Sequence, residues 1–170
     1  RAMSSRPSGR ISIVDESCNG GEPVGVAGVQ VCVNSFVKIA VAYTDDEGYY
    51  EFDKSFSSDI RYRLGFKNRK GFGIGVNLLL VPSSISAMGK QAPDGVDLTV
   101  DKESDWKMFT RCVVNNAAHD YYACWAEDKS AVYAPPVDLR FWIFRNLPKS
   151  VSPMLQHGTA IDNGRLATYL

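Results

Sequence analysis

The chain has 170 residues, of which 45% are hydrophobic and 22% are charged, a composition typical of a globular protein with one domain or one small domain and part of another. Lysine plus arginine equals aspartate plus glutamate at 19 each, and this zero formal net charge argues against a dedicated nucleic-acid or anionic-membrane surface. No apolar run approaches the ~20 residues needed to span a bilayer, so no transmembrane segment is predicted.

The first half of the chain is predicted to form a series of short strands. Residues 1–9 are rich in Ser, Arg, Pro and Gly and are expected to be a linker or disordered. Beyond them, apolar and polar residues alternate in short runs between Gly-containing loops, as is typical of antiparallel strands with one buried face. The expected strands span residues 10–14, 26–33, 37–43, 49–53, 60–66 and 96–100, with a further apolar strand or loop at 76–81.

The pattern changes after Asp101, where the sequence predicts a helix at about residues 105–123. Ser104 is a candidate N-cap, and Asp105 suits the positive N-terminal end of a helix. Apolar residues then recur at a spacing of three or four and form one stripe, which consists of Trp106, Phe109, Val113 and Ala117. A late strand is expected at 139–144, and residues 146–170 are expected to be a loop because they show no full hydrophobic period.

The four cysteines are Cys18, Cys32, Cys112 and Cys124. None lies in a Cys-x-x-Cys pattern and neither histidine is spaced to complete a ligand set, which argues against a structural zinc site. On a continuous helix Cys112 and Cys124 would lie about 18 Å apart, too far for a disulfide. Cys32 either pairs with Cys18 in the preceding loop or remains a free thiol.

The segment from Gly28 to Phe52 carries the most informative pattern. The run Gly-Val-Gln-Val-Cys-Val at 28–33 is followed by a second apolar run and by the motif Thr44-Asp45-x-x-Gly48-Tyr49-Tyr50-x-Phe52. In this turn, Asp45 and Asp46 can accept hydrogen bonds from turn amides, and Gly48 can adopt a positive φ. The order of elements over about residues 10–66 resembles the carboxypeptidase regulatory-like family.

This resemblance implies a fold and a domain layout. Modules of that family have an antiparallel transthyretin-like β-sandwich, so the chain is expected to be mostly β with a sandwich at residues 10–100. Residues 101–170 are then expected to contain one amphipathic helix and a partial α+β segment, either as a second unit or as the start of a truncated domain.

A narrower resemblance begins in the helix. The segments Met108–Arg111 and Asn116–Tyr122 are similar to a helix of secreted or surface proteins from Bacteroidota-type bacteria, in which a regulatory-like sandwich precedes a zincin-like metallopeptidase region. The resemblance implies a secreted, periplasmic or cell-surface location. The zinc motif His-Glu-x-x-His is absent, since His119 and His157 lie 38 residues apart and neither precedes Glu. No catalytic residue is therefore expected in this chain, and zinc would be a cofactor only of a downstream region.

The candidate metal ligands are Asp45, Asp46, Glu47 and His119. The acidic turn offers the oxygen ligands that calcium prefers, but it lacks the alternate spacing and distal Glu of an EF-hand loop, so a solvated turn is the favoured interpretation. His119 is a candidate metal ligand or general base. A partly buried helix histidine that bonds to a neighbour is the favoured interpretation there.

Aromatic residues are concentrated in the second half of the chain, and four of them are candidate ligand contacts: Tyr121, Tyr122, Trp125 and Trp142. Aromatic clusters bind carbohydrates and partner proteins, but they also pack between a helix and a sheet. Because Tyr121 and Tyr122 are adjacent, both cannot face the core.

Three functions remain open from the sequence. The leading hypothesis is a non-catalytic structural or interaction module of a secreted or cell-surface bacterial protein, with an adjacent domain of the same polypeptide or a surface protein as its partner. Such a module should carry an apolar patch where its neighbour docks. The alternatives are the N-terminal portion of a secreted zinc metallopeptidase whose catalytic motif lies beyond this chain, and a carbohydrate-binding module. A peptide or a glycan would be the ligand, and no nucleic-acid partner is expected.

Overall fold

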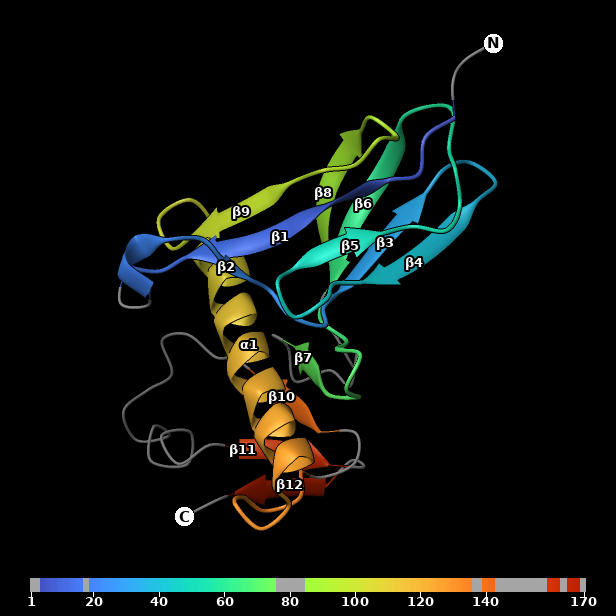
Figure 1. Ribbon diagram of the computed structural model, residues 1–170. Coiled ribbons are helices and arrows are strands. Elements are labelled where there is room, and N and C mark those ends of the chain that lie inside the picture. The colour runs from blue at the N-terminus through green and yellow to red at the C-terminus, as the bar shows by residue number, and fades with distance from the viewer. Residues whose placement is uncertain are drawn as a thin grey trace.

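The computed structural model describes residues 4–16, 19–75, 85–135, 139–142, 159–162 and 165–168. This part of the chain is mostly β, with antiparallel sheets and a helix of 22 residues (Figure 1). The coarse prediction of fold class is therefore confirmed. A short 3-10 turn, η1 (Asn19–Gly21), lies in the predicted loop before the second strand.

The first sheet, here called the β1 sheet, is built around strand β1 (Ser8–Val14). β1 pairs antiparallel with β2 (Val24–Gly25) and β5 (Tyr49–Glu51), and parallel with β9 (Leu98–Asp101). The parallel β9 pairing differs from the all-antiparallel expectation. Before β1, Ser5 exchanges backbone hydrogen bonds with Phe56, so the pairing starts inside the segment predicted to be a linker.

The second sheet, the β3 sheet, has the order β4-β3-β6-β8 and is antiparallel throughout. Its strands are β3 (Gln30–Asn34), β4 (Ile39–Tyr43), β6 (Ile60–Gly65) and β8 (Ile85–Gln91). The sequence predicted the first three of these, although β3 starts later than expected because residues 26–29 form a loop. The sequence did not predict β8, and the expected strand at 76–81 lies outside the described residues.

Residues from both sheets share one buried cluster, because period-two alternation turns every second side chain of each strand inward. The largest fully buried side chains are Tyr62, Phe52, Phe66, Phe72, Ile11, Ile60, Leu64, Ile74, Val26, Val29, Val31 and Val33. The polar alternates, such as Arg61 and Arg63 on β6, are exposed. The hydrophobic alternation that predicted the strands thus also determines which faces form the core.

Helix α1 (Trp106–Glu127) runs from the end of the β1 sheet towards a third, smaller sheet (Figure 1). Asp105, not Ser104, is the N-cap, since its carboxylate accepts a hydrogen bond of 3.0 Å from the amide of Met108. The predicted apolar stripe is half-buried or exposed. The residues that α1 buries are Met108, Arg111, Cys112, Asn115, Ala118 and His119.

The third sheet has the order β12-β11-β10-β7. Its strands are β7 (Gly73–Gly75), β10 (Arg140–Trp142), β11 (Thr159–Asp162) and β12 (Arg165–Thr168). β7 pairs parallel with β10, and β11 pairs antiparallel with β10 and β12. The prediction of a loop over residues 146–170 is wrong where β11 and β12 lie, because short strands without a clear alternation leave no periodic signal.

Cys32, Cys112 and Cys124 are free thiols, and Cys18 lies outside the described residues. Burial raises the pKa of the Cys112 thiol to about 12. Within the described ranges, no helix is both long and apolar enough to span a bilayer.

Candidate functional site

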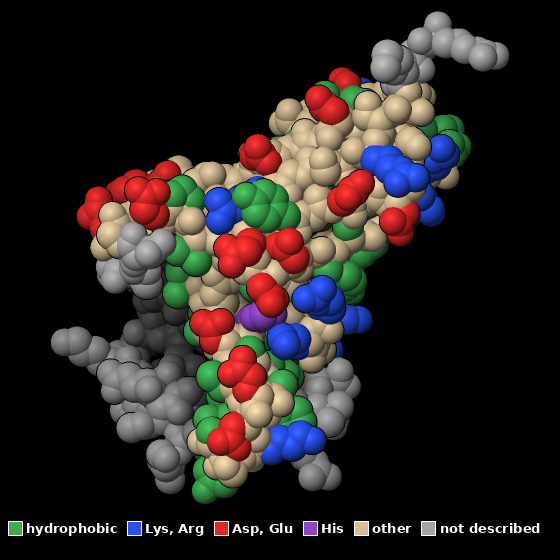
Figure 2. Space-filling model, viewed as in Figure 1, with side chains coloured by type: hydrophobic (Ala, Val, Ile, Leu, Met, Phe, Trp, Pro, Cys, Tyr) green, Lys and Arg blue, Asp and Glu red, His purple; other side chains and the backbone are tan. Residues whose placement is uncertain are grey.

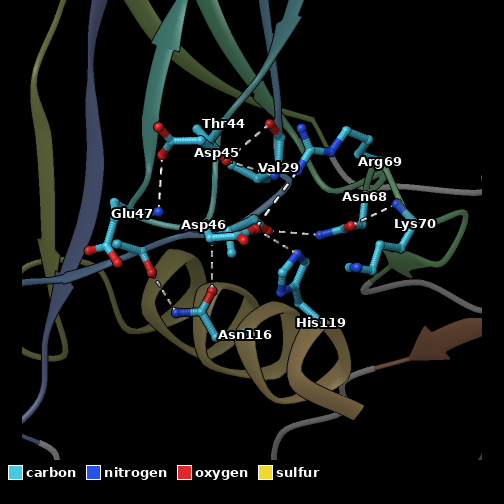
Figure 3. Close-up of polar contacts among 12 residues, drawn as sticks. Val29, Thr44, Asp45, Asp46, Glu47, Asn68, Arg69, Lys70, Asn116 and His119 are labelled. Carbon is cyan, nitrogen blue, oxygen red and sulfur yellow. Dashed lines mark hydrogen bonds and ion pairs between the residues drawn. The ribbon is translucent and has the colours of Figure 1, made fainter. Parts of the chain in front are cut away.

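The site lies where the acidic turn between β4 and β5 meets helix α1 (Figure 3). The turn is held by Asp45, whose Oδ1 accepts hydrogen bonds from the amides of Glu47 at 3.0 Å and Tyr49 at 2.8 Å. The Gly48 amide also donates to the Asp45 carbonyl at 3.1 Å. The Asp45 carboxylate is therefore an internal cap of the turn.

Thr44 fastens this turn to the loop that precedes β3. Its side chain is fully buried, and Oγ1 donates to the Val26 carbonyl at 2.6 Å and accepts from the Val29 amide at 2.9 Å. One hydroxyl thus satisfies two backbone groups of the 26–29 loop that no strand pairs. Because the loop and the turn are tied together, they present one rigid surface to the helix.

Three asparagines, here called the asparagine cluster, join this surface to α1: Asn68, Asn115 and Asn116. The Ala27 carbonyl accepts hydrogen bonds from Nδ2 of Asn68 at 2.9 Å and of Asn115 at 2.8 Å. Asn68 Nδ2 also donates to Asn115 Oδ1 at 2.9 Å. Asn116 accepts from the Ala27 amide at 3.0 Å and donates to the Gly25 carbonyl at 2.8 Å. The asparagine cluster therefore replaces the backbone partners that the loop lacks.

His119 lies one helical turn after the asparagine cluster, with its side chain 5% exposed. Its Nε2 lies 3.4 Å from Oδ1 of Asp46, whose side chain is 75% exposed, and makes no well-formed hydrogen bond among the described residues. Arg69 Nη2 lies 3.8 Å from the same carboxylate oxygen. Asp46 thus bridges the helix and the 68–71 turn, with a basic group on each side.

The electrostatics of His119 favour the neutral ring. Burial lowers its pKa, and the positive charge of Lys70 lowers it further, while Asp46 opposes the shift. A buried ring that stays neutral near neutral pH can remain packed without a full counter-charge. The pKa direction therefore agrees with a packed residue that links elements.

We expect the free energy of unfolding to fall as the pH drops below about 6.5, partly through His119. Because the pKa is lowered in the folded state, the unfolded chain takes up the proton first, and stability present above the ordinary pKa is lost below it. Urea unfolding at several pH values checks this. His119→Gln should flatten the pH dependence in that range, while His157→Gln serves as the control for the other histidine. Equal slopes for both variants would contradict the assignment.

Of the four candidate metal ligands, the structure brings only Asp46 and His119 together. Among the described residues, no group of three or more His, Cys, Asp or Glu side chains is placed to hold a metal ion. Asp45 is engaged with turn amides, and the Arg69 guanidinium approaches Asp46. A cation at Asp46 would have to displace this positive group, so the metal hypothesis stays a prediction that the geometry does not favour.

Of the candidate ligand-contact aromatics, Tyr121 and Tyr122 do not lie in a common plane. Tyr122 packs on Phe72 with ring centroids 5.2 Å apart, and it meets Tyr121 edge to face at 85°. Lys129 Nζ lies 5.5 Å from the centroid of the Trp125 ring. The side chain of Trp142 lies outside the part of the chain that the structure describes. Tyr122 therefore packs against Phe72, just before β7, and against Tyr121.

A shallow open depression of about 610 Å³ lies beside the acidic turn and is lined by Ser8, Gly9, Asp45, Tyr49, Tyr50, Glu51 and Asp97. Two of its polar side chains, Asp97 and Tyr50, already make hydrogen bonds within the fold. Asp97 accepts from the Arg10 amide at 2.8 Å, and the Tyr50 hydroxyl both donates to the Val96 carbonyl and accepts from the Val96 amide. We assign no ligand to it.

Sequence reasoning missed the asparagine cluster. Asn115 and Asn116 are adjacent in the middle of a predicted helix, where asparagine is unfavourable because its side chain competes for backbone hydrogen bonds. Such a pair is a signal that the side chains have partners outside the helix. It could have been noticed, although nothing in the sequence names the partner loop.

Comparisons with known proteins provide little further information. No family model matches the chain, and no curated protein matches its sequence significantly. Among solved structures, the chain is similar to a crystal structure of (S)-allantoin synthase, with a TM-score of 0.28 and 13% identity over 58% of this chain and 42% of that chain. A similarity at this level supports no conclusion about fold or function, and the chain spans less than half of that protein's length.

Proposed function

We propose that this chain is a non-catalytic structural or interaction module of a secreted or cell-surface bacterial protein, built on a transthyretin-like β-sandwich of the carboxypeptidase regulatory-like kind. The core shared by the β1 and β3 sheets supports the sandwich. The single observation that carries the functional proposal is the asparagine cluster, which fixes helix α1 to the loop and turn at one end of the sheets.

The energetics explain why this connection is specific. A buried amide or carbonyl left without a partner costs about 1–3 kcal/mol. Helix α1 can therefore cover the 25–27 loop only in the position where its asparagine side chains form hydrogen bonds with the backbone groups of that loop. Asn115 and Asn116 each lower helix propensity, and their tertiary hydrogen bonds offset that cost. The sandwich would therefore brace α1 and the segments that follow it in a defined orientation.

The surroundings of His119 support bracing over catalysis. Its buried ring is covered by the acidic turn and the 68–71 turn, and Nε2 faces Asp46 (Figure 3). A general base needs its nitrogen within reach of a substrate proton. In this proposal the chain acts without a catalytic group of its own, and its partner is an adjacent domain of the same polypeptide or a surface protein.

Native-state hydrogen exchange tests the bracing. We expect the amides of α1 from 111 to 119 to open with the same free energy as those of β3 and β6, because the helix and sheets form one cooperative unit. Asn116→Ala should lower the opening free energy of α1 by about 1–2 kcal/mol. Asp120→Ala, at an exposed position of the same helix, is the matched control.

Two outcomes would contradict the proposal. If α1 of the unaltered chain exchanges far faster than β3 and β6, the sheets do not brace it. If the purified chain hydrolyses a denatured protein substrate, and His119→Gln abolishes that activity, then the module is catalytic.

A further inference from the structure

Strand β4 and the turn before it carry an unusual run of exposed apolar side chains: Phe36, Val37, Ile39, Val41 and Tyr43. Their exposed fractions range from 37% at Tyr43 to 104% at Phe36. Hydrophobic side chains gather at the edge of the molecule where Figure 1 draws β4 (Figure 2). Single exposed apolar residues are ordinary, but a contiguous set marks a surface that is covered in use.

β4 is also an edge strand. In the described part of the chain it pairs only with β3, at the end of the order β4-β3-β6-β8. The Ser35 amide donates to the Lys38 carbonyl, and the Thr44 amide donates to the Val29 carbonyl. In an antiparallel ladder, every second residue of a strand forms backbone hydrogen bonds with its partner strand. Residues 40 and 42 therefore also form hydrogen bonds with β3. Residues 39, 41 and 43 direct their backbone N–H and C=O groups away from β3, towards the open edge.

The same three residues, Ile39, Val41 and Tyr43, thus present both apolar side chains and outward backbone groups. An edge of this kind is a template for pairing with another strand. One of the outward backbone groups is already occupied, because Lys54 Nζ donates a hydrogen bond to the Ile39 carbonyl at 3.1 Å. The outward backbone N–H and C=O groups of Val41 and Tyr43 have no such hydrogen bond among the described residues.

Charge along the edge indicates what the added strand is. The start of β4 is basic, with Lys38 Nζ 3.4 Å from the Ser55 carbonyl and Lys54 Nζ beside Ile39. The end of β4 leads directly into the acidic turn at residues 45–47. Two copies of this strand placed antiparallel bring the basic start of one beside the acidic end of the other, whereas a parallel arrangement places like charges together.

The remaining charges on this face do not oppose such a pair. Arg61 and Arg63 lie on β6, two strands in from the edge, with Cys32 and Asn34 of β3 between them and β4. At about 4.8 Å per strand, the arginines of two copies would be roughly 24 Å apart. That exceeds the screening length of about 8 Å at physiological ionic strength, so their repulsion is small.

We propose that two copies of this chain associate through β4, antiparallel and two-fold symmetric about Val41, so that their β3 sheets join into one continuous sheet. In this register Val41 faces the partner's Val41, and Ile39 faces the partner's Tyr43. The interface is isologous, so every contact occurs twice. The partner's Tyr43 amide replaces Lys54 on the Ile39 carbonyl, which leaves Lys54 beside the partner's Asp45. This interaction is independent of the bracing of α1.

Sedimentation of the whole chain across a range of concentrations, with reducing agent because Cys124 is exposed, tests the proposal. We expect a dimer. Val41→Lys and Val41→Glu each place like charges opposite one another on the axis and should raise the dissociation constant at least about tenfold. Because Val41 is 48% exposed, both variants should keep the wild-type circular dichroism. Their thermal midpoints should equal that of the unaltered chain at concentrations where it is monomeric, since dimerisation itself raises the midpoint.

A mixture of the two variants provides the decisive measurement. Lys at the axis of one copy would face Glu of the other. The mixture should therefore form a heterodimer, although each variant by itself stays monomeric at the same concentration. Tyr133→Lys, which changes an exposed apolar residue away from β4, is the control and should leave the dimer intact. A monomeric unaltered chain, a dimer that persists in both single variants, or a mixture that stays monomeric would each overturn the proposal.

Discussion

Gly48→Ala is expected to destabilise the chain by more than about 3 kcal/mol, or to prevent folding. Gly48 has φ +84, and a Cβ built there would lie 2.2 Å from the Ile11 carbonyl oxygen. It would also lie 2.9 Å from Gly25 Cα and from the Val26 amide nitrogen. All three neighbours are backbone atoms of paired or buried segments, so none can move aside cheaply.

The positive φ at Gly48, which the sequence predicts, accounts by itself for only about 1–3 kcal/mol of this loss. The positive φ is confirmed, and the close approach of β1 adds the larger cost. The Gly48 carbonyl also accepts the Ile11 amide at 2.9 Å, so a displaced turn would lose that bond.

Gly89→Ala separates the two contributions. Gly89 has a similar φ of +87, but a Cβ there would meet no atom within 4 Å. The free energy of unfolding of Gly89→Ala should therefore fall only by the cost of placing alanine at a positive φ, about 1 kcal/mol. Urea unfolding of both variants measures the difference directly. Equal losses would mean that the contact between the acidic turn and β1 imposes no steric demand.

Asn115→Leu is expected to cost about 2–3 kcal/mol of unfolding free energy, although leucine is the better helix former. Asn115 is fully buried, and its amide links Asn68 to the Ala27 carbonyl. Leucine would leave a donor of Asn68 without its partner in a site closed to water. The loss would thus come from an unsatisfied polar group, and added apolar surface would not restore it.

Asn116→Leu is the comparison for this second prediction. Asn116 also bonds to the 25–27 loop, but it is only half-buried, so water can replace part of what it loses. Asn116→Leu should therefore lower the free energy of unfolding by about half as much as Asn115→Leu. Chemical denaturation measures both variants. If Asn115→Leu falls within about 0.5 kcal/mol of the unaltered chain, the asparagine cluster does not fix the helix.

The strands and the acidic turn could be predicted because they depend on local patterns. Alternation identifies β6, a short apolar run identifies β4, and the Asp-x-x-Gly spacing requires a turn with a positive φ at Gly48. β8 could not be found this way, because its sequence Ile-Ser-Ala-Met-Gly-Lys-Gln places a glycine and small residues where the alternation should continue.

The face of α1 that packs inward was predicted incorrectly for a different reason. The apolar stripe that includes Phe109 and Val113 is only half-buried, while Arg111, Asn115 and His119 face the rest of the molecule. Arg111 is buried, with its guanidinium carbon 5.9 Å from the centroid of the Phe66 ring in a cation–π contact. A helix that docks on unpaired backbone groups needs polar side chains, and hydrophobic spacing does not detect them.

The pairing of β1 with β9 has a consequence for synthesis. Ser12 and Thr99 lie side by side although 87 positions separate them in the chain, and Ala27 and Asn116 are 89 positions apart. Contacts that distant carry a large loop-closure entropy and form late. On the ribosome, β1 therefore waits with one edge open until β9 has emerged, and the 25–27 loop waits longer for α1. The nascent chain is most exposed to aggregation in this interval, when the apolar edge of β4 is also uncovered.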